Sequence, residues 1–320
     1  MDINPQNQTL NNPDQTPKNS KLTAIGAWMI IIGLALGGFS INKYFKTHPI
    51  KSQNDTPKEQ LIVIEQILKE VIPDDGYEIN AKWGDIGPNL IKSGTIDLEK
   101  FKELYLQDGG LKSNELAILE NASDSNIKIT KENAHFVLNL LWAFGLAQQN
   151  KLLTKGDMIK YGDYKKFAST GGWTISAKPI EEFYSKYNWV NLDSKKEERI
   201  KNIAENVYRP CCNNSTAFPD CNHGMAALGL IEIMVAGNTP EDEIYEALRY
   251  FNSFWFSSSY LEMAIYFKQV KNKDWSEVDA KEILSKNYSS SGGWAKNIHK
   301  ELEKTPEFLP KNPEGGGCGV

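Results

Sequence analysis

Arginine is scarce in this chain of 320 residues, and its basic residues form no dense block. Only Arg199, Arg209 and Arg249 are arginines among 36 basic residues, and 41 acidic residues leave a net charge of −5. Guanidinium groups are the preferred protein ligands of phosphates and bases, and nucleic-acid-binding surfaces concentrate basic side chains. The composition therefore argues against nucleic acid as a partner.

Cysteine and histidine are also rare, with four residues of each type in the whole chain. A small secreted domain that is held together by disulfides has many more cysteines for its length. At 40% hydrophobic residues, this chain can instead bury a substantial core. Its few cysteines are therefore expected to form a local site and not a scaffold.

A sustained alternation of apolar and polar residues, the sign of a half-buried strand, is missing as well. Apolar residues recur with helical spacing in several segments, and the segment at 130–150 is apolar on nearly all faces, which is typical of a core helix. We predict a mainly α fold in which one transmembrane helix precedes a single soluble domain, built as a helical bundle or α-array. Further helices are expected at 57–72, 194–208, 223–236 and 239–255.

A run of twenty uncharged residues, 22–41, lies between Lys21 and Lys43. At a helical rise of about 1.5 Å per residue, such a run spans the roughly 30 Å of hydrocarbon in a bilayer. It is longer than the core of a signal peptide and follows a long polar leader, and no cysteine follows it that could carry a lipid. We therefore predict a single-pass anchor whose partner is the lipid bilayer.

The anchor divides the chain into segments of different composition. Polar residues and proline dominate the leader, which predicts disorder. The C-terminal end is rich in glycine and holds Cys318, which lies five residues after Pro313 and can reach about 17 Å from it. The predicted segments are a disordered tail (1–20), a transmembrane helix (21–42), a linker (43–56), an α-helical soluble domain (57–310) and a flexible Gly/Cys tail (311–320).

The residues able to bind metals or carry thiol chemistry are concentrated in one stretch, PCCNNSTAFPDCNHG at 210–224. It holds three of the four cysteines and one of the four histidines. Thiolates and an imidazole are ligands that suit zinc or copper(I). We predict a transition-metal site in this helix–helix loop, with Cys318 from the tail able to complete it. The predicted ligands are Cys211, Cys212, Cys221, His223 and Cys318.

Helix geometry sets two conditions on this metal site. Neighbouring residues such as Cys211 and Cys212 tend to point apart, so a joint site needs an unusual turn. Residues 221 and 223 would differ by about 200° on one helix, so they converge only if the helix begins after Cys221. The spacing also matches none of the common zinc-finger patterns.

The sequence is also compatible with two other functions. In an oxidising compartment, Cys221 pairs with Cys211 or Cys212 and staples an interaction or structural domain, and Cys318 can exchange with that disulfide. Alternatively, Cys221 is the nucleophile or redox cysteine of a thiol enzyme, because the following helix would lower its pKa. The sequence does not decide whether the protein is an enzyme.

The orientation of the anchor is a testable prediction. A short leader, one anchor and a large C-terminal domain is a layout common in extracytoplasmic proteins, although the lysine count favours the opposite side. We expect an enzyme reporter that is active only outside the cytoplasm to be active when fused after residue 56, and a reporter that fluoresces only inside it to be dark. The reverse pattern would place the domain in the cytoplasm. The lysines counted are Lys18 and Lys21 before the anchor and Lys43, Lys46, Lys51 and Lys58 after it.

Overall fold

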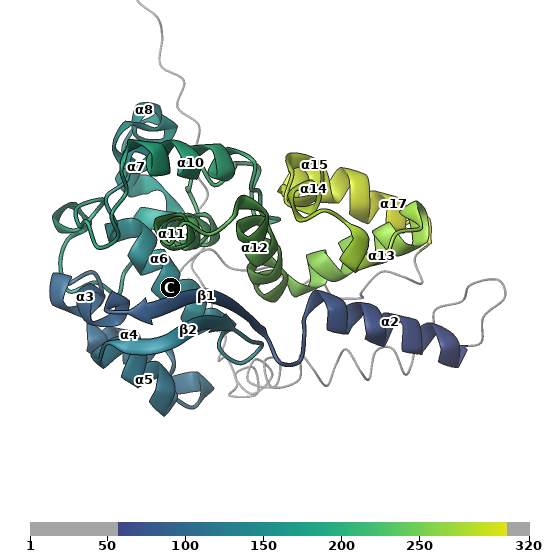
Figure 1. Ribbon diagram of the computed structural model, residues 1–320, viewed down its shortest axis with the longest axis horizontal. Helices are drawn as coiled ribbons and strands as arrows, with labels where there is room; N and C mark the ends of the chain where they lie inside the picture. The colour runs from purple at the N-terminus through teal and green to yellow at the C-terminus, as the bar shows by residue number, and fades with distance from the viewer. Residues whose placement is uncertain (1–56, 306–320) are drawn as a thin grey trace, which may run out of the picture. The chain divides into compact units, whose positions relative to one another are not determined.

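Two buried helices form the core of the computed structural model, which describes residues 57–305 (Figure 1). Helix α6 (Ala134–Ala147) and helix α11 (Asn222–Ala236) pack against each other along their length. Every residue of α6 from Phe136 onward and every residue of α11 up to Val235 is buried. Because both helices are apolar on nearly all faces, each needs neighbours on every side, and the predicted core helix is confirmed.

A close approach of the two backbones allows this packing. A Cβ atom at Gly145 of α6 would lie 2.3 Å from the carbonyl oxygen of Met225, and one at Gly229 of α11 would lie 2.6 Å from that of Leu141. Both separations are too short for a side chain, so only glycine fits at these positions. The contact fixes the position of α11, and therefore of the loop that precedes it.

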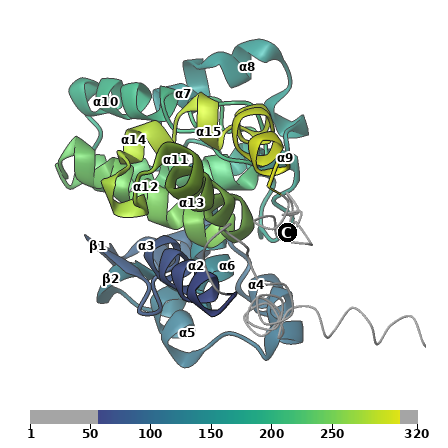
Figure 2. The same ribbon diagram turned by 90° about the vertical axis from the view of Figure 1, so that its right-hand side faces the viewer.

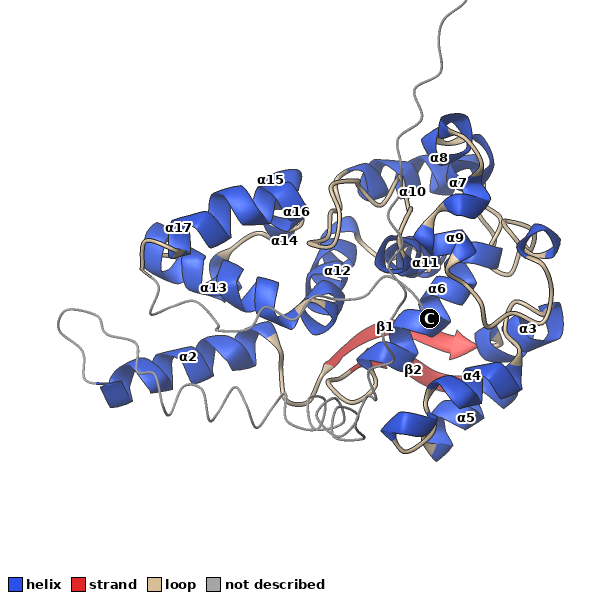
Figure 3. Cartoon of the chain, turned by 180° about the vertical axis from the view of Figure 1, so that it is seen from behind, coloured by secondary structure: helices blue, strands red, loops and turns tan. Residues whose placement is uncertain are grey.

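Other helices surround this pair, and the mainly α class is confirmed for the described residues (Figures 1 and 3). Helix α10 (Ser194–Glu205) packs on α11, and α2 (Pro57–Val71) packs on α13 (Ser257–Lys271). The remaining helices are α2 (Pro57–Val71), α3 (Ile86–Ser93), α4 (Leu98–Leu104), α5 (Ser113–Glu120), α7 (Lys151–Lys155), α8 (Asp157–Tyr161), α9 (Ala168–Gly171), α10 (Ser194–Glu205), α12 (Glu241–Trp255), α13 (Ser257–Lys271), α14 (Ala280–Ile283), α15 (Lys286–Ser289), α16 (Ser291–Trp294) and α17 (Lys300–Leu302), with a π-helical turn at Ala295–His299.

None of the helices within residues 57–305 is long and apolar enough to cross a bilayer. The predicted transmembrane helix at 21–42 lies outside the described residues. So do the predicted disordered tail, the linker and the Gly/Cys tail with Cys318. These four assignments stay predictions from sequence.

A small antiparallel sheet accompanies the helices and was not predicted. Strands β1 (Tyr77–Gly84) and β2 (Ser123–Ile129) pair beside α3 and α5 (Figure 2). In β1 the residues Ile79 and Trp83 are buried, whereas the polar residues between them are exposed. This alternation is visible in YEINAKW, but it is short, and the pairing register shifts twice within the sheet.

One ionisable side chain, Glu232, is completely buried in α11. Its Oε1 accepts a hydrogen bond of 2.7 Å from Nδ2 of Asn150, and its Oε2 has no partner in the described part of the chain. Burial raises the pKa of Glu232 well above 4.5, against the opposite effect of the Asn150 hydrogen bond. Burial therefore favours the neutral form of this carboxyl group in the folded protein.

The buried carboxyl group makes stability depend on pH. Its folded-state pKa lies above the unfolded value, so its contribution is complete below about pH 4.5 and is lost as the pH rises toward the folded pKa. The loss amounts to about 1.4 kcal/mol of unfolding free energy per pH unit. Glu232→Gln cannot ionise, so we expect it to be increasingly more stable than the parent protein as the pH rises above about 4.5, measured by urea unfolding.

The matched control is Glu243→Gln on the neighbouring helix α12, where the carboxyl group is exposed. This variant is expected to differ from the parent protein by a small amount at every pH. Equal pH profiles for the two variants would contradict the assignment of a neutral Glu232.

Candidate metal centre

Three cysteine sulfurs come together in the loop between α10 and α11. The Sγ atoms of Cys211, Cys212 and Cys221 all lie within 4.8 Å of one another, and the Sγ atoms of Cys211 and Cys221 are 3.5 Å apart. No disulfide bond joins these three cysteines. The structure therefore has the clustered thiols that the sequence predicted, without the disulfide of the alternative interpretation.

A tight turn solves the problem posed by two adjacent cysteines. The backbone N–H of Cys212 donates to the carbonyl oxygen of Arg209 at 3.4 Å, which folds the chain back at Pro210. The backbone N–H of Ser291, at the start of α16, then donates to the carbonyl oxygen of Cys212 at 2.9 Å. The turn and this contact hold both neighbouring sulfurs on the side of the loop that faces Cys221.

Cys221 is itself the N-cap of α11. Its backbone is extended, at φ −118° and ψ 164°, and its Sγ accepts a hydrogen bond of 3.3 Å from the N–H of Gly224. The helix therefore begins after Cys221, as the shared Cys221–His223 site required. With 5% of its surface exposed, Cys221 is buried at the positive end of the helix dipole.

His223 does not join the three thiols, although the helix begins where the prediction needs it. Its ring packs against Phe256 and Trp255, with ring centroids 4.3 and 5.9 Å away, and it is outside the group of ligand atoms around Cys221. Nδ1 of His223 is buried without a hydrogen-bond partner among the described residues. Three of the five predicted ligands thus come together, His223 lies apart, and Cys318 is outside the described residues.

Arg209 organises the loop, a role that the sequence did not reveal. Its side chain is completely buried, and its Nε donates a hydrogen bond of 3.0 Å to Sγ of Cys221. The other nitrogens bind Asp220 Oδ1 at 3.0 Å and the carbonyl oxygen of Asn214 at 2.9 Å. A buried guanidinium needs partners of this kind, so Arg209 links both ends of the loop.

Gly224 makes room for this guanidinium in the first turn of α11. A Cβ atom there would lie 2.4 Å from Nη2 and 2.8 Å from Nε of Arg209. Any larger residue would push the guanidinium away from Cys221. The stretch at 210–224 was identified from its cysteines, but Gly224 and Arg209 at its two ends belong to the same unit.

The electrostatics favour negative charge on one sulfur. Hydrogen bonds from the thiols of Cys211 and Cys212 lower the pKa of Cys221 well below its usual range, and the charge of Arg209 acts in the same direction, against the effect of burial. For Cys212 the hydrogen bond with Cys211 lowers the pKa, but the bond to Cys221 and burial outweigh it and raise the pKa to about 11. Negative charge is therefore more favourable on Cys221 than on Cys212.

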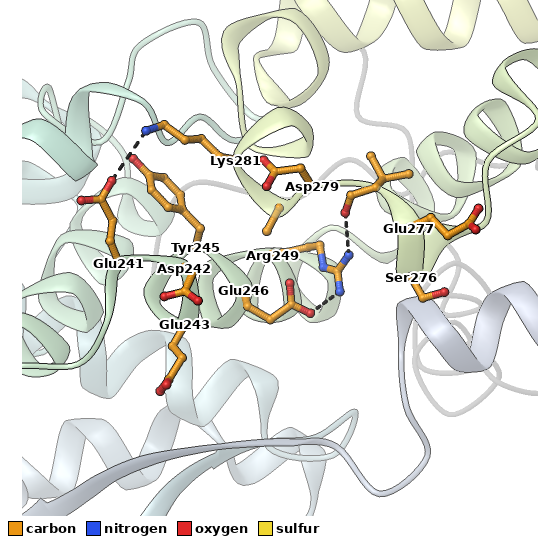
Figure 4. A pocket seen from close by; sticks show the side chains of 12 residues that line it. Glu241, Asp242, Glu243, Tyr245, Glu246, Arg249, Ser276, Glu277, Asp279 and Lys281 are labelled. Carbon is orange, nitrogen blue, oxygen red and sulfur yellow. Dashed lines mark hydrogen bonds and ion pairs between the residues drawn. The ribbon is translucent and has the colours of Figure 1, made fainter.

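A second polar site, a hollow on the surface of α12, contains none of the predicted ligands (Figure 4). Arg249 lies at its base, pairs with Glu246 and donates to the carbonyl oxygen of Val278 at 3.3 Å. Lys281 lies 3.6 Å from Glu241. These contacts join α12 to α14 and to the segment before it, so we assign the hollow a structural role.

Comparison with known proteins finds no matching family, no matching curated protein and no matching solved structure.

Replacing Arg209 by lysine tests whether its hydrogen bonds hold the loop together. Arg209→Lys keeps the charge but loses the planar fork, so it cannot satisfy Cys221, Asp220 and Asn214 together. Since a hydrogen bond that involves a charged group contributes about 1.5–3 kcal/mol, we expect the free energy of unfolding to fall by about 3 kcal/mol. Chemical denaturation of the parent protein and the variant measures this loss.

Arg199→Lys is the matched control, because Arg199 is half-buried and donates to a single carbonyl oxygen, that of Thr239. Its expected loss is below about 1 kcal/mol. If the two substitutions cost the same, Arg209 does not organise the loop.

Proposed function

We propose that the protein holds one transition-metal ion, zinc with copper(I) as the alternative, on the sulfurs of Cys211, Cys212 and Cys221. The observation that carries this proposal is the mutual approach of the three Sγ atoms within 4.8 Å. Two sulfurs bound to one ion at about 2.3 Å with a tetrahedral angle lie about 3.8 Å apart. Small shifts of the loop therefore suffice to place all three sulfurs around one ion.

Charge balance favours zinc over copper(I). Three thiolates and the Asp220 carboxylate face a single buried cation, the guanidinium of Arg209. A divalent ion neutralises more of this charge than a monovalent one, and uncompensated buried charge is costly. Copper(I) remains the alternative because its affinity for soft thiolates is high and three sulfurs can satisfy it.

A structural zinc site needs a fourth ligand, and we propose Cys318 for this position. Helix α16 is in contact with the loop through the N–H of Ser291 and the N–H of Gly292, which donates to Oδ1 of Asn213 at 2.7 Å. The thirteen residues from Pro306 to Cys318 can span up to about 43–47 Å. A segment of this length supports the return of Cys318 to the loop.

The metal would tie the loop to α11 and leave Arg209 as the residue that orients one of its ligands. Nε of Arg209 donates to the sulfur of Cys221, as hydrogen-bond donors around metal–thiolate sites do. We further propose that residues 22–41 anchor the chain in a membrane and that the metal-binding domain lies on the extracytoplasmic side. The uncharged run of twenty residues supports this part of the proposal.

Metal analysis of the purified full-length chain tests the site. We expect about one zinc or copper ion per chain in the parent protein and less than about a tenth of that in Cys221→Ser, because a lost thiolate removes a large part of the binding free energy. His223→Ala is the matched control from the adjoining turn and is expected to keep the metal. Cys318→Ser is expected to weaken zinc binding and to leave copper(I) binding unchanged.

Circular dichroism of each variant verifies that the helices are intact. A folded parent protein without stoichiometric metal, also after reconstitution with zinc or copper(I) under reducing conditions, would rule out the metal site. A metal that persists in folded Cys221→Ser would place it elsewhere in the protein.

A further inference from the structure

The sulfurs of Cys211 and Cys212 have different nearest neighbours. Sγ of Cys211 is 3.5 Å from Sγ of Cys221, whereas Sγ of Cys212 lies near two oxygens, the carbonyl of Asn214 at 3.8 Å and Oδ1 of Asp220 at 3.9 Å. A disulfide bond is about 2.05 Å long. Cys211 and Cys221 therefore need to approach by only about 1.5 Å to be joined.

The sulfurs of Cys211 and Cys221 also differ in their exposure to solvent. Cys221 is buried with 5% of its surface exposed, whereas Cys211 is half-buried and reachable from solvent. Thiol–disulfide exchange requires a collinear approach of the attacking sulfur, so a large substrate can meet Cys211 but not Cys221. The accessible thiol and the hidden thiol lie next to each other.

The hidden sulfur is surrounded by donors that stabilise negative charge. Nε of Arg209 donates to Sγ of Cys221 at 3.0 Å, and the N–H of Gly224, in the first turn of the fifteen-residue helix α11, donates at 3.3 Å. A thiolate is the attacking species in exchange reactions. Sγ of Cys221 is therefore positioned to attack Sγ of Cys211 when Cys211 is in a mixed disulfide.

We propose that the metal-free site carries out thiol–disulfide exchange, with Cys211 as the entry thiol and Cys221 as the resolving thiol, and that its substrate class is an accessible disulfide. It uses the sulfurs of the proposed metal site but does not require that metal. A bound metal would occupy the same sulfurs, so metal binding and exchange exclude each other.

The reaction balances in two steps. Cys211 loses its proton to solvent and attacks one sulfur of the substrate RS–SR, which forms a Cys211–S–S–R mixed disulfide and releases one thiolate RS⁻. Cys221 then attacks Sγ of Cys211, which forms the Cys211–Cys221 disulfide and releases the second RS⁻. Two electrons pass from the cysteine pair to the substrate disulfide, and the released thiolates take up protons according to the pH.

Oxidised glutathione is the probe that tests this proposal. The full-length chain carries Cys318→Ser to remove the tail thiol, and a chelator removes bound metal before the reaction. We expect two glutathione thiols released per chain and a disulfide between Cys211 and Cys221. With Cys221→Ser added, the reaction is expected to stop at glutathione bound to Cys211, with one thiol released. Ser215→Ala, in the same loop, is the matched control and is expected to release two.

Peptide mapping identifies the bond. Residues 211–221 contain no lysine or arginine, so trypsin leaves all three cysteines on one peptide, whereas a protease that cleaves before Asp220 separates Cys221 from the other two. Fragmentation of the linked peptides between residues 211 and 212 then shows which of these two cysteines is bonded to Cys221. No release of glutathione, a bond from Cys212 to Cys221, or two thiols released by folded Cys221→Ser would each overturn the proposal. If Cys221→Ser does not fold, the proposal is tested by the disulfide found in the chain that keeps Cys221: a Cys211–Cys221 bond supports it, and any other bond overturns it.

The metal content of an untreated sample separates this proposal from the metal-binding one. A chain that binds metal but does not react with oxidised glutathione would contradict the exchange proposal and would leave the metal-binding proposal intact. A chain that exchanges but holds no metal contradicts metal binding alone, because the exchange reaction is measured after chelation.

Discussion

The arrangement of the loop depends on one buried guanidinium. A completely buried positive charge is tolerated only where hydrogen bonds and a counter-charge surround it, and Arg209 finds these on Cys221, Asp220 and the backbone of the same loop. Satisfying Arg209 therefore brings residues that are eleven and twelve positions away back to it. Gly224 is required because the guanidinium occupies the space of its side chain.

The core determines where this unit is built. Gly145 and Gly229 allow α6 and α11 to approach until their backbones are in contact, and this contact fixes the end of α11 that bears Cys221. Helix α16 holds the opposite side of the loop through the N–H of Ser291. Metal binding and disulfide exchange would both depend on this rigid position, because each needs sulfurs that are held a few ångströms apart.

The sequence predicted the elements that are long and strongly apolar. The core helices, the amphipathic α10 and the clustering of Cys211, Cys212 and Cys221 follow from composition and spacing, and the structure confirms them. It did not predict the sheet, because the alternation in β1 covers few residues and helical segments flank it. Arg209 was counted among the rare arginines, but nothing in its local sequence indicates that its side chain is buried.

The sequence by itself determined which helices form the core and that a thiol-rich loop precedes α11, because periodicity and composition are local properties. Only the tertiary structure decided that two adjacent cysteines face the same sulfur and that His223 turns to Phe256 and Trp255 instead. The first result depends on a turn that Arg209 and Ser291 stabilise, and the second on packing between α11 and α12. Both depend on contacts between residues far apart in the chain, which local patterns do not encode.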